Sequence, residues 1–387
     1  MENGVLHMPC EVVLSNNGGS SIANIIVSTG THRVLLLTDK GVFGTGKITS
    51  YVEILKTSGI EVFVINDIPS EPECEQIIEI SDRACEYGAE LMLAIGGGSV
   101  MDTAKLVSAI LTNPDFASNI LDASTIKNPS LPVIMVPTTA GTGSEATQNA
   151  IVLVKEQQLK VGIIHLNFLP GYVVLDPDLT TTLPKHITAA TGIDALCHAI
   201  ETLISRKANS ISRTFSFAAI KLIYENLRKC YDNGNDREAR ANMLLAAFYS
   251  GVCINSSSTV AVHALAYPLG GSYHIPHGVS NAMLLAEVLK FNMSACINEY
   301  AQIAETIGVG NGETDENKAA MVIDEICKLI RYVGIPTDIT VYNVSYSEID
   351  FLVDSAAKVT RLLDQNPRAI TKADIRNIYE RLFPKKN

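Results

Sequence analysis

Short apolar runs alternate with amphipathic segments along the first half of the chain. Near-continuous apolar runs that end in Gly, Pro, Asp or Thr are typical of parallel strands covered on both faces. The segments between them, such as 46–59 and 74–88, repeat apolar residues at helical spacing and end in glycine. This alternation predicts a doubly wound α/β domain that binds ligands beyond the carboxyl ends of its strands. The predicted strands are 33–39, 61–67, 91–98, 131–139 and 172–178, and an added hairpin is predicted over 150–165.

The pattern changes after residue 180, where strand signals nearly vanish. Pro177 and Pro184 bracket a junction that should not continue a helix. Beyond the junction, apolar residues recur at helical spacing, which predicts an all-helical second domain. We therefore expect an α/β domain over residues 1–180 and an all-helical domain over residues 181–387. The segments that carry the helical repeat are 186–205, 210–231, 237–254 and 316–334.

Length, charge and cysteine usage narrow the class of protein. A chain of 387 residues is too long for one hydrophobic core, which agrees with two domains. The net charge of −11 argues against nucleic-acid binding, because no basic stripe is available to phosphates. The N-terminus does not read as a signal peptide, and no apolar run approaches the ~20 residues of a membrane span. Eight scattered cysteines without a CxxC pair fit reduced thiols, so we expect a cytoplasmic protein.

Two glycine-rich turns follow strands of the predicted α/β domain. The first, Gly96–Ser99, precedes a helix, where free backbone N–H groups can cradle a pyrophosphate, although a plain turn capped by Ser99 explains it equally well. The second, 136–147, offers hydroxyls and two glycines that allow close approach, with a polar surface loop as the alternative. Two such turns in one domain favour an extended phosphate-bearing ligand. Asp39, which alone would read as a turn residue, then favours NAD over NADP.

The second domain gathers histidines in two segments, with His198 in the first and three more in the second. Asp194 and His198 stand four residues apart in a predicted helix, so they project from one face. They can share a cation or form a buried polar pair. His263 and His277 would complete a set of three imidazoles and one carboxylate, which suits Fe²⁺ or Zn²⁺. Spacing alone leaves both alternatives open, because two distant segments must converge.

Four segments resemble, in order, those of the iron-containing (group III) alcohol dehydrogenases: GGGSVMDTAK, PTTAGTGSE, TGIDALCHAIE and HALAYPLGGSYHIPHG. The likeness extends over essentially the whole chain. It implies the architecture shared with dehydroquinate synthase, with an N-terminal dinucleotide-binding domain and a C-terminal helical metal-binding domain. It also implies one divalent metal, Fe²⁺ or Zn²⁺, on Asp194, His198, His263 and His277. The NAD contacts that it implies are Asp39, Gly97, Gly98, Ser99, Asp102, Thr138, Thr139, Thr142 and Lys160.

The chain departs from the family pattern at two places. Many relatives have a second histidine four residues after the first in the HALAYP segment, thought to relay a proton, and here Tyr267 stands there. A phenol with a pKa near 10 is a poor base, so His274 or ordered water becomes the alternative relay. The stretch before His263 is rich in hydroxyls over 256–259. These hydroxyls either bond back to their own helix turn or line a pocket for a small polar or anionic substrate.

The resemblance implies an oxidoreductase that transfers a hydride between NAD and a small primary alcohol or aldehyde. The polar residues favour a small polar, even anionic, aldehyde, and sulfoacetaldehyde, reduced to isethionate, is among the candidates. A general short-chain alcohol, lactaldehyde or 1,3-propanediol dehydrogenase is the alternative. A glycerol dehydrogenase-like or dehydroquinate synthase-like enzyme is a more distant one. We expect no nucleic-acid or membrane partner, and the family implies a homodimer or a higher homo-oligomer.

Overall fold

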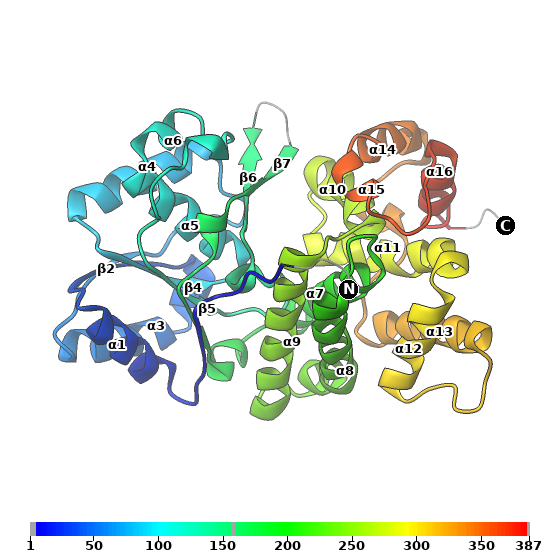
Figure 1. Cartoon of the computed structure of the whole chain (residues 1–387), viewed down its shortest axis with the longest axis horizontal. Helices are drawn as coiled ribbons and strands as arrows, with labels where there is room; N and C mark the ends of the chain where they lie inside the picture. Colours follow the sequence, from blue (N-terminus) through cyan, green and yellow to red (C-terminus); the bar gives the residue numbers. More distant parts are fainter. Residues whose placement is uncertain (1–4, 156–158, 385–387) are drawn as a thin grey trace. The chain divides into compact units, whose positions relative to one another are not determined.

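The computed structural model describes residues 5–155 and 159–384, and the chain divides into two compact units (Figure 1). One unit is His7–Thr182, and the other is formed by Leu183–Asn387 together with the N-terminal residues up to Leu6. The first unit is built on a sheet, whereas the second is made of helices in the part of the chain that the structure describes.

A six-stranded sheet with the order β1-β8-β5-β4-β2-β3 forms the centre of the first unit. Every neighbouring pair in it is parallel, so all six carboxyl ends lie along one edge. Its strands are β1 (Glu11–Leu14), β2 (Arg33–Leu37), β3 (Glu61–Ile65), β4 (Leu91–Gly96), β5 (Val133–Pro137) and β8 (Tyr172–Leu175). A separate antiparallel hairpin, β6 (Asn149–Val154) and β7 (Leu159–Ile164), lies where the sequence predicts one.

Helices cover both faces of this sheet, which explains why its strands are almost continuously apolar. Side chains of β2, β4, β5 and β8 that point to one face form a buried cluster with α1 and α3. Helices α4 and α5 pack against each other on the opposite side (Figure 1). The helices of this unit are α1 (Gly18–Thr29), α2 (Lys40–Gly44), α3 (Lys47–Thr57), α4 (Cys74–Tyr87), α5 (Gly98–Thr112) and α6 (Pro114–Ser118).

The second unit is a stack of helices around α7, whose residues are buried almost throughout. Helix α7 packs against α8, α9 and α11, and α11 packs against α10. The helices are α7 (Lys185–Ile204), α8 (Ser210–Asp232), α9 (Arg237–Ser256), α10 (Ala261–Tyr273), α11 (His277–Asn292), α12 (Ile297–Ile307), α13 (Asp315–Tyr332), α14 (Ile349–Ala356), α15 (Thr360–Leu363) and α16 (Lys372–Glu380). Among the described residues, α7 is long and apolar enough to cross a membrane, and α9 with α10 passes the same test only if this pair, bent by 106°, is counted as one span. However, 83% of the apolar window of α7 is buried inside the unit, as in the core helix of a globular domain.

Candidate metal centre and cofactor-binding loops

Three helices of the second unit bring four ligand-type side chains together. Asp194 and His198 project from one face of α7, His263 lies in the first turn of α10, and His277 begins α11. One carboxylate oxygen and three imidazole nitrogens from these residues all lie within 4.8 Å of one another. The two distant sequence segments therefore do converge, which is the condition that spacing alone left open.

The distances between these atoms suit a four-coordinate ion. Bonds of about 2.1 Å in a tetrahedral site place neighbouring ligand atoms about 3.4 Å apart. The Nε2 atoms of His198 and His263 are 2.9 Å apart, and Asp194 Oδ1 lies 3.9 Å from His263 Nε2 and 3.8 Å from His277 Nε2. Asp194, His198 and His263 are buried, whereas the His277 side chain is 34% exposed. The residues present thus fit a divalent metal with one accessible side.

The carboxylate of Asp194 is held in its charged form, as a ligand must be. Burial alone would raise its pKa, but His198, His277 and His263, with the Asn281 amide, hold the pKa below its ordinary value. A bound cation would replace the positive charge of these rings, because imidazoles bind a transition metal in their neutral form.

Glu201 orients one of these ligands. It is fully buried, and its Oε1 accepts hydrogen bonds from the backbone N–H groups of Val260 (3.1 Å) and Val262 (2.7 Å). Its Oε2 contacts Nδ1 of His263. A carboxylate on Nδ1 fixes the imidazole tautomer so that Nε2 faces the ligand cluster. The sequence offers a signal for this role, because Glu201 lies three residues after His198 on the same helix, although a surface or helix-pairing role is the commoner interpretation of such a glutamate.

The cofactor loops gather at the carboxyl edge of the sheet in the first unit. The chain order of the strands reverses between β2 and β4, and Asp39 follows β2 while the first glycine turn follows β4. The second turn follows β5, the neighbour of β4, and Thr138 N–H bonds to Gly96 O (3.0 Å). A Cβ added to Gly98 would lie 3.0 Å from the Thr142 side chain, so the two turns pack closely. A dinucleotide is expected beyond this reversal point, with its pyrophosphate at the start of α5.

Several side chains predicted to contact NAD bond within the protein. Asp39 caps α2, because its Oδ1 accepts from Val42 N–H (2.9 Å). Ser99 donates to the Ser70 carbonyl, and Lys160 pairs with Glu71 (2.6 Å). Asp102 is buried, accepting from Ser144 Oγ (2.5 Å) and Ile151 N–H (3.1 Å). These contacts position the loops, and a direct NAD contact of each side chain stays a prediction. Gly97, Thr139 and Thr142 at the turns remain predicted contacts as well, with Thr138 buried beneath them.

A buried charged group underlies the second turn. Lys105 is fully buried, and its ammonium donates to the Ser144 carbonyl (2.7 Å), the Asn149 carbonyl (2.7 Å) and the Thr147 hydroxyl (3.1 Å). Burial lowers the pKa of Lys105 to about 8, although Asp102 and Glu145 oppose this shift. Lys105 therefore ties the start of β6 and the turn before it to α5.

Glu145→Gln is expected to stabilise the protein more at alkaline than at acidic pH. Burial raises the pKa of Glu145 from 4.5 to about 7. Between these values the folded chain holds a proton that the unfolded chain lacks, so stability falls as pH rises through this window, by up to about 3 kcal/mol. Melting temperatures without cofactor at about pH 5 and about pH 8 test this. A variant-minus-native difference that does not grow with pH would contradict it.

Tyr267 and His274, the predicted relay residues, occupy different environments. The Tyr267 ring lies beside the His277 ring, with centroids 6.4 Å apart. Burial raises the pKa of Tyr267, with Arg361 opposing the shift, so the phenol keeps its proton at neutral pH. His274 is exposed at the C-terminal cap of α10 with φ +53°, and no contact described in the structure joins its ring to the four ligands. Proton relay by either residue stays a prediction.

The hydroxyls before His263 mostly bond to backbone. Ser256 donates to Val252 O (3.3 Å), Ser257 to Thr202 O (2.9 Å) and Ser258 to Thr259 O (2.8 Å). Only Ser256 bonds back to its own helix turn, and Ser257 bonds to α7 instead, but all three hydroxyls bond within the helical unit rather than lining a pocket. The polarity of a substrate site must therefore come from other residues.

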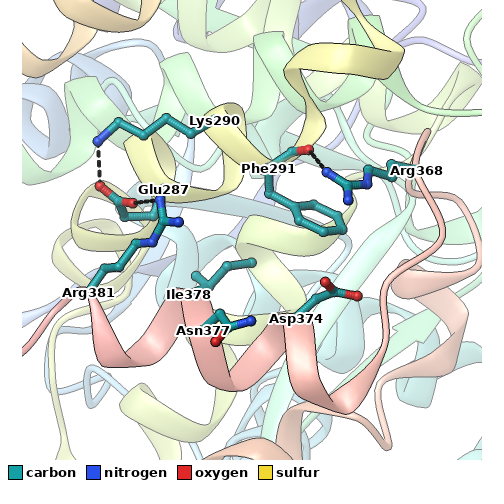
Figure 2. A pocket seen from close by; sticks show the side chains of 8 residues that line it. All are labelled: Glu287, Lys290, Phe291, Arg368, Asp374, Asn377, Ile378 and Arg381. Carbon is teal, nitrogen blue, oxygen red and sulfur yellow. Dashed lines mark hydrogen bonds and ion pairs between the residues drawn. The ribbon is translucent and has the colours of Figure 1, made fainter.

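A surface pocket of about 250 Å³ on the helical unit is distinct from the ligand cluster (Figure 2). Its charges are satisfied locally, because Glu287 pairs with both Lys290 (2.6 Å) and Arg381 (3.1 Å). Arg368 donates to Phe291 O (2.7 Å) and stacks on its ring. None of the predicted site residues lines this pocket, which is formed by Glu287, Lys290, Phe291, Arg368, Asp374, Asn377, Ile378 and Arg381.

Comparison with known proteins decides the family. The model of the iron-containing alcohol dehydrogenases matches residues 9–177, and the model of the C-terminal part of the Fe-containing alcohol dehydrogenase family matches residues 188–383. The chain belongs to the iron-containing alcohol dehydrogenase family. The predicted family, fold and enzyme class, an NAD-dependent oxidoreductase with a metal site, are thereby confirmed.

Relatives within the family differ in their substrates. The long-chain-alcohol dehydrogenase 1 of Geobacillus thermodenitrificans is 35% identical over 92% of this chain and 90% of its own length. A crystal structure of 1,3-propanediol oxidoreductase superposes with a TM-score of 0.94 at 30% identity, covering 99% of this chain and all of that one. The sulfoacetaldehyde reductase of Bifidobacterium kashiwanohense, solved with NAD⁺, gives a TM-score of 0.91 at 26% identity over all of both chains. Family membership therefore leaves the substrate open.

Proposed function

We propose that the protein interconverts a small polar aldehyde and its primary alcohol with NAD(H) and a divalent metal, and that it favours anionic aldehydes such as sulfoacetaldehyde. The observation that carries the substrate class is the place of a cation, Arg361, on α15, which packs against α10, the helix that carries Tyr267 and His263. The similarity to a sulfoacetaldehyde reductase over the full chain supports the same class.

The protein's own groups prepare the reaction in the helical unit. Glu201 holds the His263 ring so that Nε2 faces Asp194 and His198. The partly exposed side of the cluster, at His277, is where a substrate oxygen can approach. Tyr267, which stays protonated, can donate a hydrogen bond to that oxygen from beside His277. Bound at these sites, the cation would stabilise negative charge on the substrate oxygen, and NAD(H) would supply the hydride acceptor or donor.

In the first unit, the turns and the start of α5 bind and orient the dinucleotide. Backbone N–H groups at Gly97 and Gly98 are not blocked by side chains, and the N-terminus of α5 favours a phosphate. The second oxygen of Asp39, which has no hydrogen-bond partner among the described residues, can accept from a ribose hydroxyl while the first caps α2. Its negative charge would repel a 2′-phosphate, which agrees with NAD rather than NADP.

Arg361 has the features of a group that selects for negative charge. It lies on α15, which packs against α10, the helix of Tyr267. Its side chain is exposed and has no acidic partner among the residues that the structure describes. An unpaired guanidinium can pair with a sulfonate or carboxylate, which a simple alkanal lacks. The hydroxyl-rich segment 256–259 does not supply this preference, since its serines bond to backbone.

Arg361→Ala is expected to lower kcat/KM for anionic aldehydes roughly tenfold, equivalent to about 1.4 kcal/mol, while changing that for neutral aldehydes little. NADH consumption with metal-loaded enzyme measures both, using sulfoacetaldehyde and succinate semialdehyde against butanal and lactaldehyde. Lys358→Ala is the matched control, because it removes the same charge from an exposed residue that does not act on Tyr267.

The same panel can overturn each level of the proposal. Preference of the native enzyme for butanal over every anionic aldehyde would reject the substrate class and leave a general short-chain alcohol dehydrogenase. No NADH oxidation with any aldehyde would reject the function itself. A homo-oligomer in the cytoplasm stays a prediction beside it.

A further inference from the structure

Asn281 sits among the ligand atoms of the metal centre, yet it is not one of the four ligands. It lies one turn after His277 on α11 and is fully buried. Its Nδ2 lies 2.7 Å from Asp194 Oδ1 and 3.2 Å from Nε2 of both His263 and His277. One amide thus touches three of the four ligand side chains.

The carbonyl oxygen of this amide, Asn281 Oδ1, is buried and unpaired within the described part of the chain. A buried carbonyl without a partner costs about 1–3 kcal/mol, so packing alone would favour an apolar side chain on this helix. Such a cost is characteristic of functional sites. The amide must therefore serve the cluster that it faces.

We propose that Asn281 is a positioning residue that holds the Asp194 carboxylate in its ligating orientation and thereby sets the metal affinity. The carboxylate 2.7 Å away is an acceptor, which identifies the facing atom of the amide as its NH₂ group. The lone pairs of His263 and His277 are needed for the metal. The lasting hydrogen bond of the amide is therefore the one to Asp194. This inference rests on the proposed metal centre but not on the substrate.

The contact also links the two helices that must converge. Asp194 belongs to α7 and Asn281 to α11, so their hydrogen bond ties the helix of His198 to the helix of His277. Hydrogen bonds to ligating carboxylates typically contribute 10–100-fold to metal affinity. The amide and the ligand His277 lie on one face of α11, so the same helix supplies a ligand and the donor that orients Asp194.

Asn281→Leu tests this role, because leucine has the same number and branching of side-chain heavy atoms as asparagine but donates no hydrogen bond. Chelator competition with Zn²⁺ or Co²⁺ should show a 10–100-fold weaker affinity, and the visible spectrum of the Co²⁺ form should change. The melting temperature of the metal-free protein should change little, since removal of the unpartnered carbonyl offsets the loss of the hydrogen bond to Asp194. A purely structural role would instead lower that melting temperature.

Asn292→Leu is the matched control on the same helix. Asn292 is equally buried and exchanges two hydrogen bonds with Asn366 (2.9 and 2.8 Å), far along α11 from the ligands. It should lower the melting temperature and leave metal affinity unchanged. Unchanged metal affinity in Asn281→Leu, or a loss matched by a fall in metal-free stability, would overturn the proposal. If Asn281→Leu does not fold, Asn281→Ala provides the same comparison, and a native protein that binds no metal would instead refute the proposed function.

Discussion

His277→Ala is expected to abolish metal retention and turnover together, with kcat/KM falling at least about 10³-fold. The structure places His277 Nε2 3.8 Å from Asp194 Oδ1 and within reach of His263, so alanine leaves three donors around the cation. A metal that stabilises a developing oxyanion lowers the activation free energy by several kcal/mol, and about 4 kcal/mol corresponds to a 10³-fold change in kcat/KM. Metal content after gel filtration and NADH consumption measure the two effects.

His186→Ala is the control for this substitution, because His186 is an exposed histidine on α7 that contacts none of the ligands. It should retain metal and activity. His263→Ala should reproduce the His277→Ala result, with an added loss of stability because Glu201 would be left buried without the imidazole. Full activity of either ligand variant in a metal-free preparation would contradict a metal-dependent reaction.

The pairing of Asp194 with His198 could be predicted from sequence, because both lie on one helix and a spacing of four residues places their side chains on the same face. The convergence of His263 and His277 could not, since it depends on how α10 and α11 pack against α7. The convergence was indicated instead by the resemblance to the iron-containing alcohol dehydrogenases, in which all four residues are implied as ligands. Asn281 lies at helical spacing from the predicted ligand His277 and still escaped prediction, because an asparagine in an apolar helix signals nothing until its partner is known.

The fold was more predictable than the roles of individual polar side chains. Apolar runs predicted five of the six strands of the sheet, but β1 was missed, since it has only four residues and is half-exposed on a sheet edge. The hydroxyls at 256–258 and the carboxylate of Asp102 illustrate the harder problem. A serine hydroxyl or an aspartate carboxylate can form hydrogen bonds with a ligand or with other groups of the protein. Here the hydroxyls and the carboxylate bond within the protein.

Gly278→Ala is expected to lower the melting temperature by about 2–12 °C and to weaken metal binding roughly 100-fold. A Cβ at Gly278 would lie 2.2 Å from the carbonyl oxygen of Ala190 and 3.3 Å from Cβ of Asp194. The first clash is with backbone, so α11 must move away from α7, at a cost of about 1–3 kcal/mol or more. His277, the residue before Gly278, would move with it and separate from Asp194.

Gly270→Ala separates this effect from the general consequence of adding a methyl group to a helix. The nearest atom to a Cβ at Gly270 of α10 is 3.7 Å away, an ordinary contact, so alanine should be neutral or stabilising by up to about 1 kcal/mol. Differential scanning calorimetry with and without Zn²⁺ measures both variants. A Gly278→Ala protein that keeps native metal affinity would mean that the cluster tolerates displacement of α11. The metal centre would then depend on the flexibility of its side chains rather than on the close approach of two helices.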